Sequence, residues 1–297
     1  MAVTKQRLDF IDLAKGVCIL LLAIGHCGVN PEIPGYTLVA VPLFFVISGL
    51  FFKNYDKLRD MWINKINRLL IPFFFFYFTA YLCFYAIKWF VPNLLVTEAN
   101  GILDIFYNRQ FFNGPIWFIL CLFWCNILFG LVCRYIQDEW KRLLVVIVMG
   151  AIGWYLGYCD IILPMFIDVA FTALPFFVFG HYLKRLDVLQ NNHSRYNLLF
   201  AAVLWGISLM LEHLTDTRLS MHYNIIEGWA TWPLSLIQVV SMIYLCKVVR
   251  TVPFITYAGR YSLVILCVHH MIYRPLIVLF SGILIPPPPP LFQQPGL

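Results

Sequence analysis

The stretch LLIPFFFFYFTAYLCFYAIKWFV, from Leu69 to Val91, carries a single charged side chain, that of Lys88 near its end. The hydrocarbon layer of a bilayer is about 30 Å thick and a helix rises about 1.5 Å per residue, so roughly 20 apolar residues cross it. The run is continuously apolar and does not alternate, which favours a helix over a barrel strand. It therefore predicts a membrane-spanning helix.

The rest of the chain has the same character. Of its 297 residues, 61% are apolar and 12% are charged, whereas a soluble domain is about 45–50% apolar and about 25% charged. We predict an all-α fold, a polytopic transmembrane helical bundle that forms a single domain over residues 1–297. Nine spans are expected, at Phe10–Val29, Tyr36–Phe52, Leu69–Val91, Ile116–Tyr135, Leu143–Cys159, Ile161–Leu183, Leu198–Leu211, Trp229–Cys246 and Tyr261–Ile285.

The basic residues predict the orientation, because Lys and Arg are retained on the cytoplasmic side of short loops. With a cytoplasmic N-terminus, 16 of the 21 basic residues lie in inner segments, and only Arg109 and Arg218 lie in outer loops. The net charge of +6 therefore comes from the inner segments and does not indicate binding to nucleic acid. The inner segment Lys53–Arg68 alternates basic and apolar residues at helical spacing, which predicts a short amphipathic helix along the membrane surface.

Two ionisable residues in the first span are candidates for function, since such groups are costly inside a bilayer. Lys15 and His26 are 11 positions apart. On a helix this separation places the two side chains within about 20° of the same face and roughly 16 Å apart along the axis. Both are expected to point into one crevice, where a histidine suits general-base removal of a proton from a hydroxyl. The alternatives are a Lys15 that snorkels to the interface and an interfacial His26.

Several motifs resemble one known family. RLDFIDLAKGVCILLLAIGH (Arg7–His26), followed by PLFFVISGLFF (Pro42–Phe52), resembles the opening of the acyltransferase-3 family of integral membrane acyltransferases. Weaker matches follow in order: KINRLLIPFF at Lys65–Phe74, PIWFI at Pro115–Ile119, ALPFFVFGHYL at Ala173–Leu183 and AGRYSLVILCVHH at Ala258–His270. The resemblance runs along nearly the whole chain.

The resemblance implies an enzyme that takes an acyl group, usually acetyl, from cytoplasmic acyl-CoA. It would transfer that group without a metal to a hydroxyl of a cell-envelope polysaccharide or other carbohydrate or glycolipid acceptor, in the bacterial cell (inner) membrane. By similarity His26 is the catalytic histidine, and Lys15, at a position where the family more usually has Arg, assists donor binding. Arg68 is a further candidate for the donor phosphates, although positive-inside retention explains it equally. Ser48 and Trp117 belong to the resembling motifs, as substrate-binding or as packing residues.

One departure concerns the orientation of the histidine. Many family members carry an acidic residue just before FFVISG, where this chain has Pro42, so the orienting partner is absent or supplied elsewhere. Asp168, expected in the middle of the sixth span, is a second catalytic candidate, with a structural hydrogen bond as the alternative. His269 and His270 are adjacent on a helix, so we expect at most one to face the crevice.

Two other functions are compatible with parts of this pattern. In a multi-pass transporter or exporter of a polar or lipid-linked substrate, Lys15, His26 and Asp168 would form a proton or substrate path, but no internal repeat supports it. A catalytically silent scaffold is a third possibility. The nine cysteines lie in or at the edges of spans without partners at metal-ligand spacing, so neither a disulfide framework nor a metal site is predicted.

The loops and the C-terminus complete the expectations. Two long outer loops, Pro92–Pro115 and Glu212–Gly228, either cover a substrate site or are solvated connections. Family members commonly have ten spans, whereas here the ninth is followed by five prolines, Pro286–Pro290, which cannot continue a helix. We therefore predict an irregular proline-rich tail over 286–297 and suspect a truncated or altered C-terminus.

Overall fold

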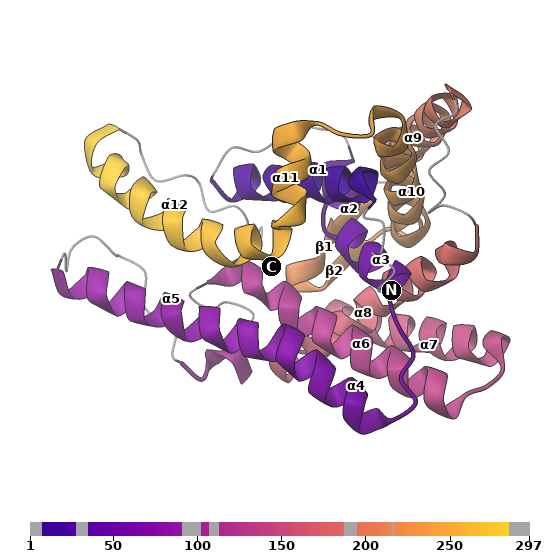
Figure 1. The fold of residues 1–297 in the computed structure, drawn as a ribbon, viewed down its shortest axis with the longest axis horizontal. Helices are drawn as coiled ribbons and strands as arrows, with labels where there is room; N and C mark the ends of the chain where they lie inside the picture. Colours follow the sequence, from indigo (N-terminus) through magenta and orange to yellow (C-terminus); the bar gives the residue numbers. More distant parts are fainter. Residues whose placement is uncertain are drawn as a thin grey trace, which may run out of the picture.

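A computed structural model describes residues 8–27, 35–90, 102–106, 113–186, 195–215 and 217–284. This part of the chain forms a helical bundle with one short antiparallel hairpin (Figure 1). The elements are α1 (Asp9–His26), α2 (Tyr36–Val39), α3 (Pro42–Leu50), α4 (Leu58–Lys65), α5 (Ile71–Phe90), α6 (Trp117–Tyr135), α7 (Glu139–Tyr158), α8 (Ile167–Leu183), α9 (Arg195–Thr215), β1 (Arg218–Ser220), β2 (Ile225–Glu227), α10 (Thr231–Val249), α11 (Pro253–Arg260) and α12 (Ser262–Leu284). The predicted tail, 286–297, and most of the predicted outer loop Pro92–Pro115 lie outside the described residues.

The helices are those of an integral membrane protein. In the part of the chain that the structure describes, six stretches are long and apolar enough to cross a bilayer: Leu58–Ile87, Gly114–Tyr135, Glu139–Tyr158, Pro164–Leu186, Tyr196–Thr215 and Thr231–Val249. Two shorter apolar helical stretches accompany them. They are Tyr36–Leu50, which comprises α2 and α3, and Ser262–Tyr273, which lies within α12. Helix α1 is 18 residues long and holds three charges within that length, on Asp9, Asp12 and Lys15, whereas each of the six stretches includes 18 consecutive residues with at most two charges. The multispan helical prediction is thus confirmed, while the count of nine spans and the cytoplasmic N-terminus stay predictions.

The bundle has a centre and a periphery. In α6 and α8, 72% and 67% of the most apolar stretch is buried inside the protein, against 17% in α7 and 11% in α9. The peripheral helices leave large apolar side chains exposed, among them Ile147 on α7 and Leu199 on α9. An exposed apolar surface of this extent suits contact with lipid. The candidate site lies beside α6, one of these two central helices.

The structure differs from the predicted segments in five places. Helix α4 does not lie apart along a surface but continues through a π turn, Ile66–Leu70, into α5 (Figure 1), and its Met61 packs against Gly130 of α6. Helix α9 extends to Thr215, as its short predicted span allowed. The hairpin and the short helix α11 were not predicted. Helix α8 begins at Ile167, so Asp168 lies in its first turn and not in the middle of the span.

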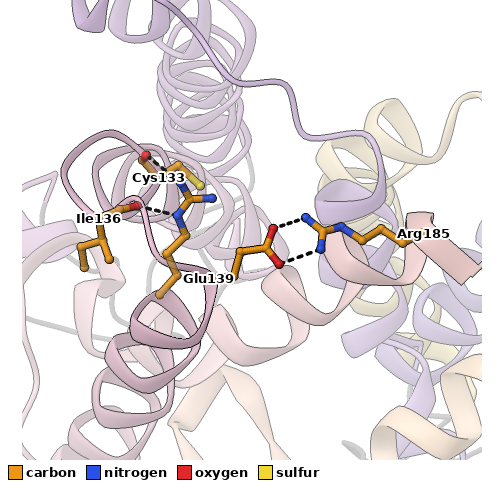
Figure 2. A network of polar contacts seen from close by, with 5 residues as sticks. Cys133, Ile136, Glu139 and Arg185 are labelled. Atoms are coloured by element: carbon orange, nitrogen blue, oxygen red, sulfur yellow. Dashed lines mark hydrogen bonds and ion pairs between the residues drawn. The ribbon is translucent and has the colours of Figure 1, made fainter.

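A polar network fixes the ends of three helices on one side of the bundle. The Arg142 guanidinium donates hydrogen bonds to the carbonyl oxygens of Ile136, at 2.6 Å, and Cys133, at 3.4 Å, just beyond and within the last turn of α6; Figure 2 labels both acceptor residues. Arg185 donates two hydrogen bonds to the Glu139 carboxylate at the start of α7. The hydrogen bonds from Arg142 satisfy carbonyl groups that the end of α6 would otherwise leave without a donor. They involve basic residues that the charge pattern predicts to be cytoplasmic.

Candidate active site

A cavity of about 330 Å³ lies between α1, α3, α6 and α12. Lys15, in the first half of α1, and His26, its last residue, both line it. Ser48 of the FFVISG segment and Trp117 of the PIWFI segment line it too. The structure therefore brings together four residues that the sequence singled out from three separate motifs. The 18-residue helix α1 keeps Lys15 and His26 on one face, and the packing of α3 and α6 brings Ser48 and Trp117 to the same cavity.

The wall of this cavity is mainly apolar. Its remaining lining residues are Ile19, Leu22, Val41, Phe44, Ile47, Phe51, Leu69, Pro115, Phe118, Leu122, Ser262, Leu263 and Leu266. An apolar wall with few polar groups is typical of small-molecule sites, where those groups orient the ligand. Exclusion of water by such a wall also strengthens each electrostatic contact inside it.

Reciprocal glycines place the FFVISG helix against the centre of the bundle. A Cβ atom added to Gly49 of α3 would lie against the Phe177 carbonyl group of α8, and one added to Gly180 of α8 would lie against the Val46 carbonyl group of α3. Small residues allow two membrane helices to approach at the level of their backbones. Gly49 directly follows the cavity-lining Ser48, so this close approach determines how α3 meets the site.

An ion-pair network lies at the Lys15 end of the cavity. The Lys15 ammonium is 2.7 Å from the carboxylate of Asp12, a residue that is only 4% exposed. Arg260, at the end of α11, is 3.0 Å from the Asp9 carboxylate and 3.8 Å from that of Asp12. Lys15 thus points toward the cavity with its charge balanced within the protein, and it does not need to snorkel to find a partner.

Two histidines of α12 meet His26 at the other end. The ring centroid of His26 is 5.2 Å from that of His269 and 6.1 Å from that of His270. His269 Nε2 is 3.3 Å from His26 Nδ1, within hydrogen-bonding distance. At most one of these adjacent histidines is expected to face the crevice; both rings approach His26, and neither lines the cavity itself.

Trp117 connects the cavity with the hairpin segment. Its ring stacks on that of His222, with a centroid distance of 5.6 Å and an interplanar angle of 17°, and Phe166 stacks on the same histidine at 5.8 Å. His222 lies between β1 and β2, in the predicted outer loop Glu212–Gly228. This loop therefore contributes a residue directly behind the cavity wall.

Two candidates from the sequence lie apart from the cavity. Arg68 is exposed in the π turn, next to the lining residue Leu69. Asp168 is fully buried, and its carboxylate accepts a hydrogen bond of 3.4 Å from the Leu163 amide across a turn in which Met165 and Phe166 have left-handed backbone angles. The geometry of Asp168 matches the structural alternative, since it ties this turn to α8.

The sequence did not single out Asp12 or Arg260, and it did not predict that His269 meets His26. Asp12 and Lys15 are three positions apart, a spacing that places two side chains side by side on a helix, and this signal was present in the sequence. Arg260 and His269 both belong to the resembling segment AGRYSLVILCVHH, but no spacing within that segment indicates that they meet the first helix. Among the described residues no cluster of three or more metal-ligating side chains is found.

Comparison with known proteins identifies the family. The model of the acyltransferase 3 family, described as an acyltransferase domain, matches residues 8–293. This match includes every residue that lines the cavity. Neither the curated proteins nor the solved structures contain a significant match to the chain.

Proposed function

Since the chain belongs to the acyltransferase 3 family and is a membrane acyltransferase, we propose that it transfers an acetyl group from acetyl-CoA to a hydroxyl of a cell-envelope glycan. The observation that supports this proposal is the single cavity lined by both Lys15 and His26. In the proposed reaction Lys15 serves the donor, and His26 is the general base that activates the acceptor hydroxyl.

The size of the cavity favours a short acyl group. Ligand sites commonly enclose about 300–1,000 Å³, so a volume of about 330 Å³ lies at the lower end of the range. The thioester with its acetyl group and one sugar hydroxyl are small enough for such a space, whereas a long lipid chain would need more room. Acetyl is therefore the acyl group that we propose.

In the proposed reaction the proton of the acceptor passes through His26. His26 takes the proton of the acceptor hydroxyl while the oxygen attacks the thioester carbonyl carbon. The carbon–sulfur bond then breaks, and the leaving thiolate takes the proton from His26, which yields an ester and free CoA. General-base catalysis of this kind contributes about 10²–10⁴-fold to a rate.

The positions of Lys15 and His26 along α1 match the two substrates. With the N-terminus in the cytoplasm, as the basic residues predict, Lys15 lies toward the cytoplasmic end and His26 about 16 Å further along the helix. A cytoplasmic donor with a long pantetheine arm enters past Lys15, and its thioester reaches His26 deeper in the cavity. The acceptor then approaches from the side of Trp117 and the hairpin.

The test uses His26→Gln, which keeps a polar side chain in the cavity but supplies no base. Vesicles from cells that express each variant are incubated with radiolabelled acetyl-CoA, and free thiol and labelled glycan are measured. We expect a loss of about 10²–10⁴-fold with normal folding, while the matched change His213→Gln, at an exposed histidine of α9, has no effect. A well-folded His26→Gln variant with a near wild-type rate would refute the assignment. Comparing envelope glycans with and without the gene identifies the acceptor.

A further inference from the structure

His26, at the end of α1, and His269, on α12, belong to one chain of hydrogen-bonding contacts. His269 Nδ1 is 2.8 Å from the carbonyl oxygen of Ile265, one turn earlier in α12. His269 Nε2 is 3.3 Å from His26 Nδ1. The chain of contacts therefore runs from a backbone carbonyl through one imidazole to the next.

The carbonyl fixes the position of each proton. A carbonyl oxygen only accepts hydrogen bonds, so His269 Nδ1 must carry the hydrogen. In a neutral imidazole the other nitrogen, Nε2, then has a lone pair and accepts. The hydrogen between the two rings must consequently belong to His26 Nδ1, and His26 Nε2 is the nitrogen with the lone pair.

Burial favours this neutral arrangement over a charged one. His269 is partly buried and packs beside His26 and Tyr273, and burial disfavours the charged form of an imidazole. A cationic His269 would donate from Nε2 and force the hydrogen of a neutral His26 onto its own Nε2. That nitrogen would then be unable to take a proton from a hydroxyl.

The structure assigns His269 as a positioning residue that holds His26 in the tautomer with a basic Nε2, an inference that rests on the proposed function of His26. The arrangement serves the purpose for which other enzymes use a carboxylate beside a catalytic histidine, namely to fix tautomer and ring orientation. It also stabilises the transient His26 imidazolium, because the Nδ1–H bond to His269 remains in place when Nε2 gains a proton. His269 itself does not touch the reacting atoms.

The tautomer is measured directly, without any acceptor. The full chain is labelled with [¹⁵N]histidine, placed in lipid bilayers and studied by nitrogen NMR, and the His26 signals are identified by their loss in His26→Gln. Neutral His26 should carry its hydrogen on Nδ1 in the wild type. In His269→Phe it should shift toward the Nε2–H tautomer that free histidine prefers. Nε2 protonation in the wild type, or an unchanged tautomer in His269→Phe, would overturn the inference.

Kinetics supply the second test, with acetyl-CoA as the donor and vesicles from expressing cells as the source of acceptor. His269→Phe should lower kcat roughly 10–100-fold, the range seen when the outer partner of a metal-bound histidine is lost, and leave KM for acetyl-CoA unchanged. His269→Gln should recover much of the rate, since its amide oxygen can accept from His26 Nδ1. The matched control is His181→Phe, in which the ring lies among Phe52 and Phe129.

The results separate this inference from the function on which it depends. If His26→Gln is inactive but His269→Phe keeps the wild-type kcat, the positioning role is wrong and the function stands. If His26→Gln is active, the proposed function fails, whatever the NMR shows of the tautomer. Equal losses in His269→Phe and His181→Phe would mean that the defect is one of packing, and the positioning role would again be wrong.

Discussion

Gly49→Ala is the substitution that best tests how the fold builds the site. A Cβ atom at this position would lie 2.7 Å from the carbonyl carbon of Phe177 and closer still to its oxygen. Ordinary contact begins at 3.4 Å, so α3 and α8 must separate by at least 0.7 Å. Backbone atoms, unlike the tip of a flexible side chain, cannot turn away.

The cost can be isolated with a matched control. Gly206 of α9 is exposed, and a Cβ atom there would meet nothing within 4 Å. Both substitutions replace a helical glycine, so both gain about 0.5–1 kcal/mol of helix stability. The difference between Gly49→Ala and Gly206→Ala is therefore the overpacking term, about 1–3 kcal/mol.

Stability is measured by reversible unfolding of the purified protein in mixed micelles, and acetyl-CoA turnover is measured in the same preparations. Gly49→Ala should be the less stable variant and should lose activity, because Ser48 and Phe44 of the same helix line the cavity. Gly206→Ala should be at least as stable as the wild type and fully active. Equal stability of the two variants would refute the claim that α3 and α8 pack through their backbones.

Three further predictions concern charge and orientation. Lys15→Ala should raise KM for acetyl-CoA with a smaller change in kcat, and Lys15→Arg should be tolerated; an unchanged KM in steady-state kinetics of the alanine variant would exclude donor binding by Lys15. Asp12→Asn should destabilise the protein by about 1–3 kcal/mol, because Lys15 loses a charged partner at 2.7 Å, and unfolding in mixed micelles measures this. Single cysteines at Asn54, which is exposed before α4, and at Asn100 probe topology in a cysteine-free background. An impermeant thiol reagent on intact cells should label position 100 alone, and the reverse pattern would invert the topology.

The helical segments were predictable because each is a property of consecutive residues. An apolar run long enough for the bilayer must fold as a helix, since unpaired backbone groups are too costly in lipid. The predicted helix boundaries were wrong where tertiary contacts determine how a helix begins or continues. Helix α4 joins α5 because Met61 packs on α6, and α8 starts late because its preceding residues form a turn tied to the Asp168 carboxylate.

Some site residues were likewise predictable from the local sequence, whereas the position of others depends on packing. Lys15 and His26 were recognisable together because they lie on one helix, where spacing alone fixes the shared face. Ser48 and Trp117 were singled out by their motifs, but only packing brings them to the same cavity.

By itself the sequence determined that this chain is a helical membrane protein, that it resembles one family of acyltransferases, and that one face of its first helix carries a lysine and a histidine. Only the tertiary structure decided that Arg260 joins the Asp9 and Asp12 carboxylates at the Lys15 end of the site and that His269 lies beside His26. The physical reason is distance along the chain. His26 and His269 are 243 positions apart, so no local pattern predicts that they meet, and the packing of α12 against α1 brings them together.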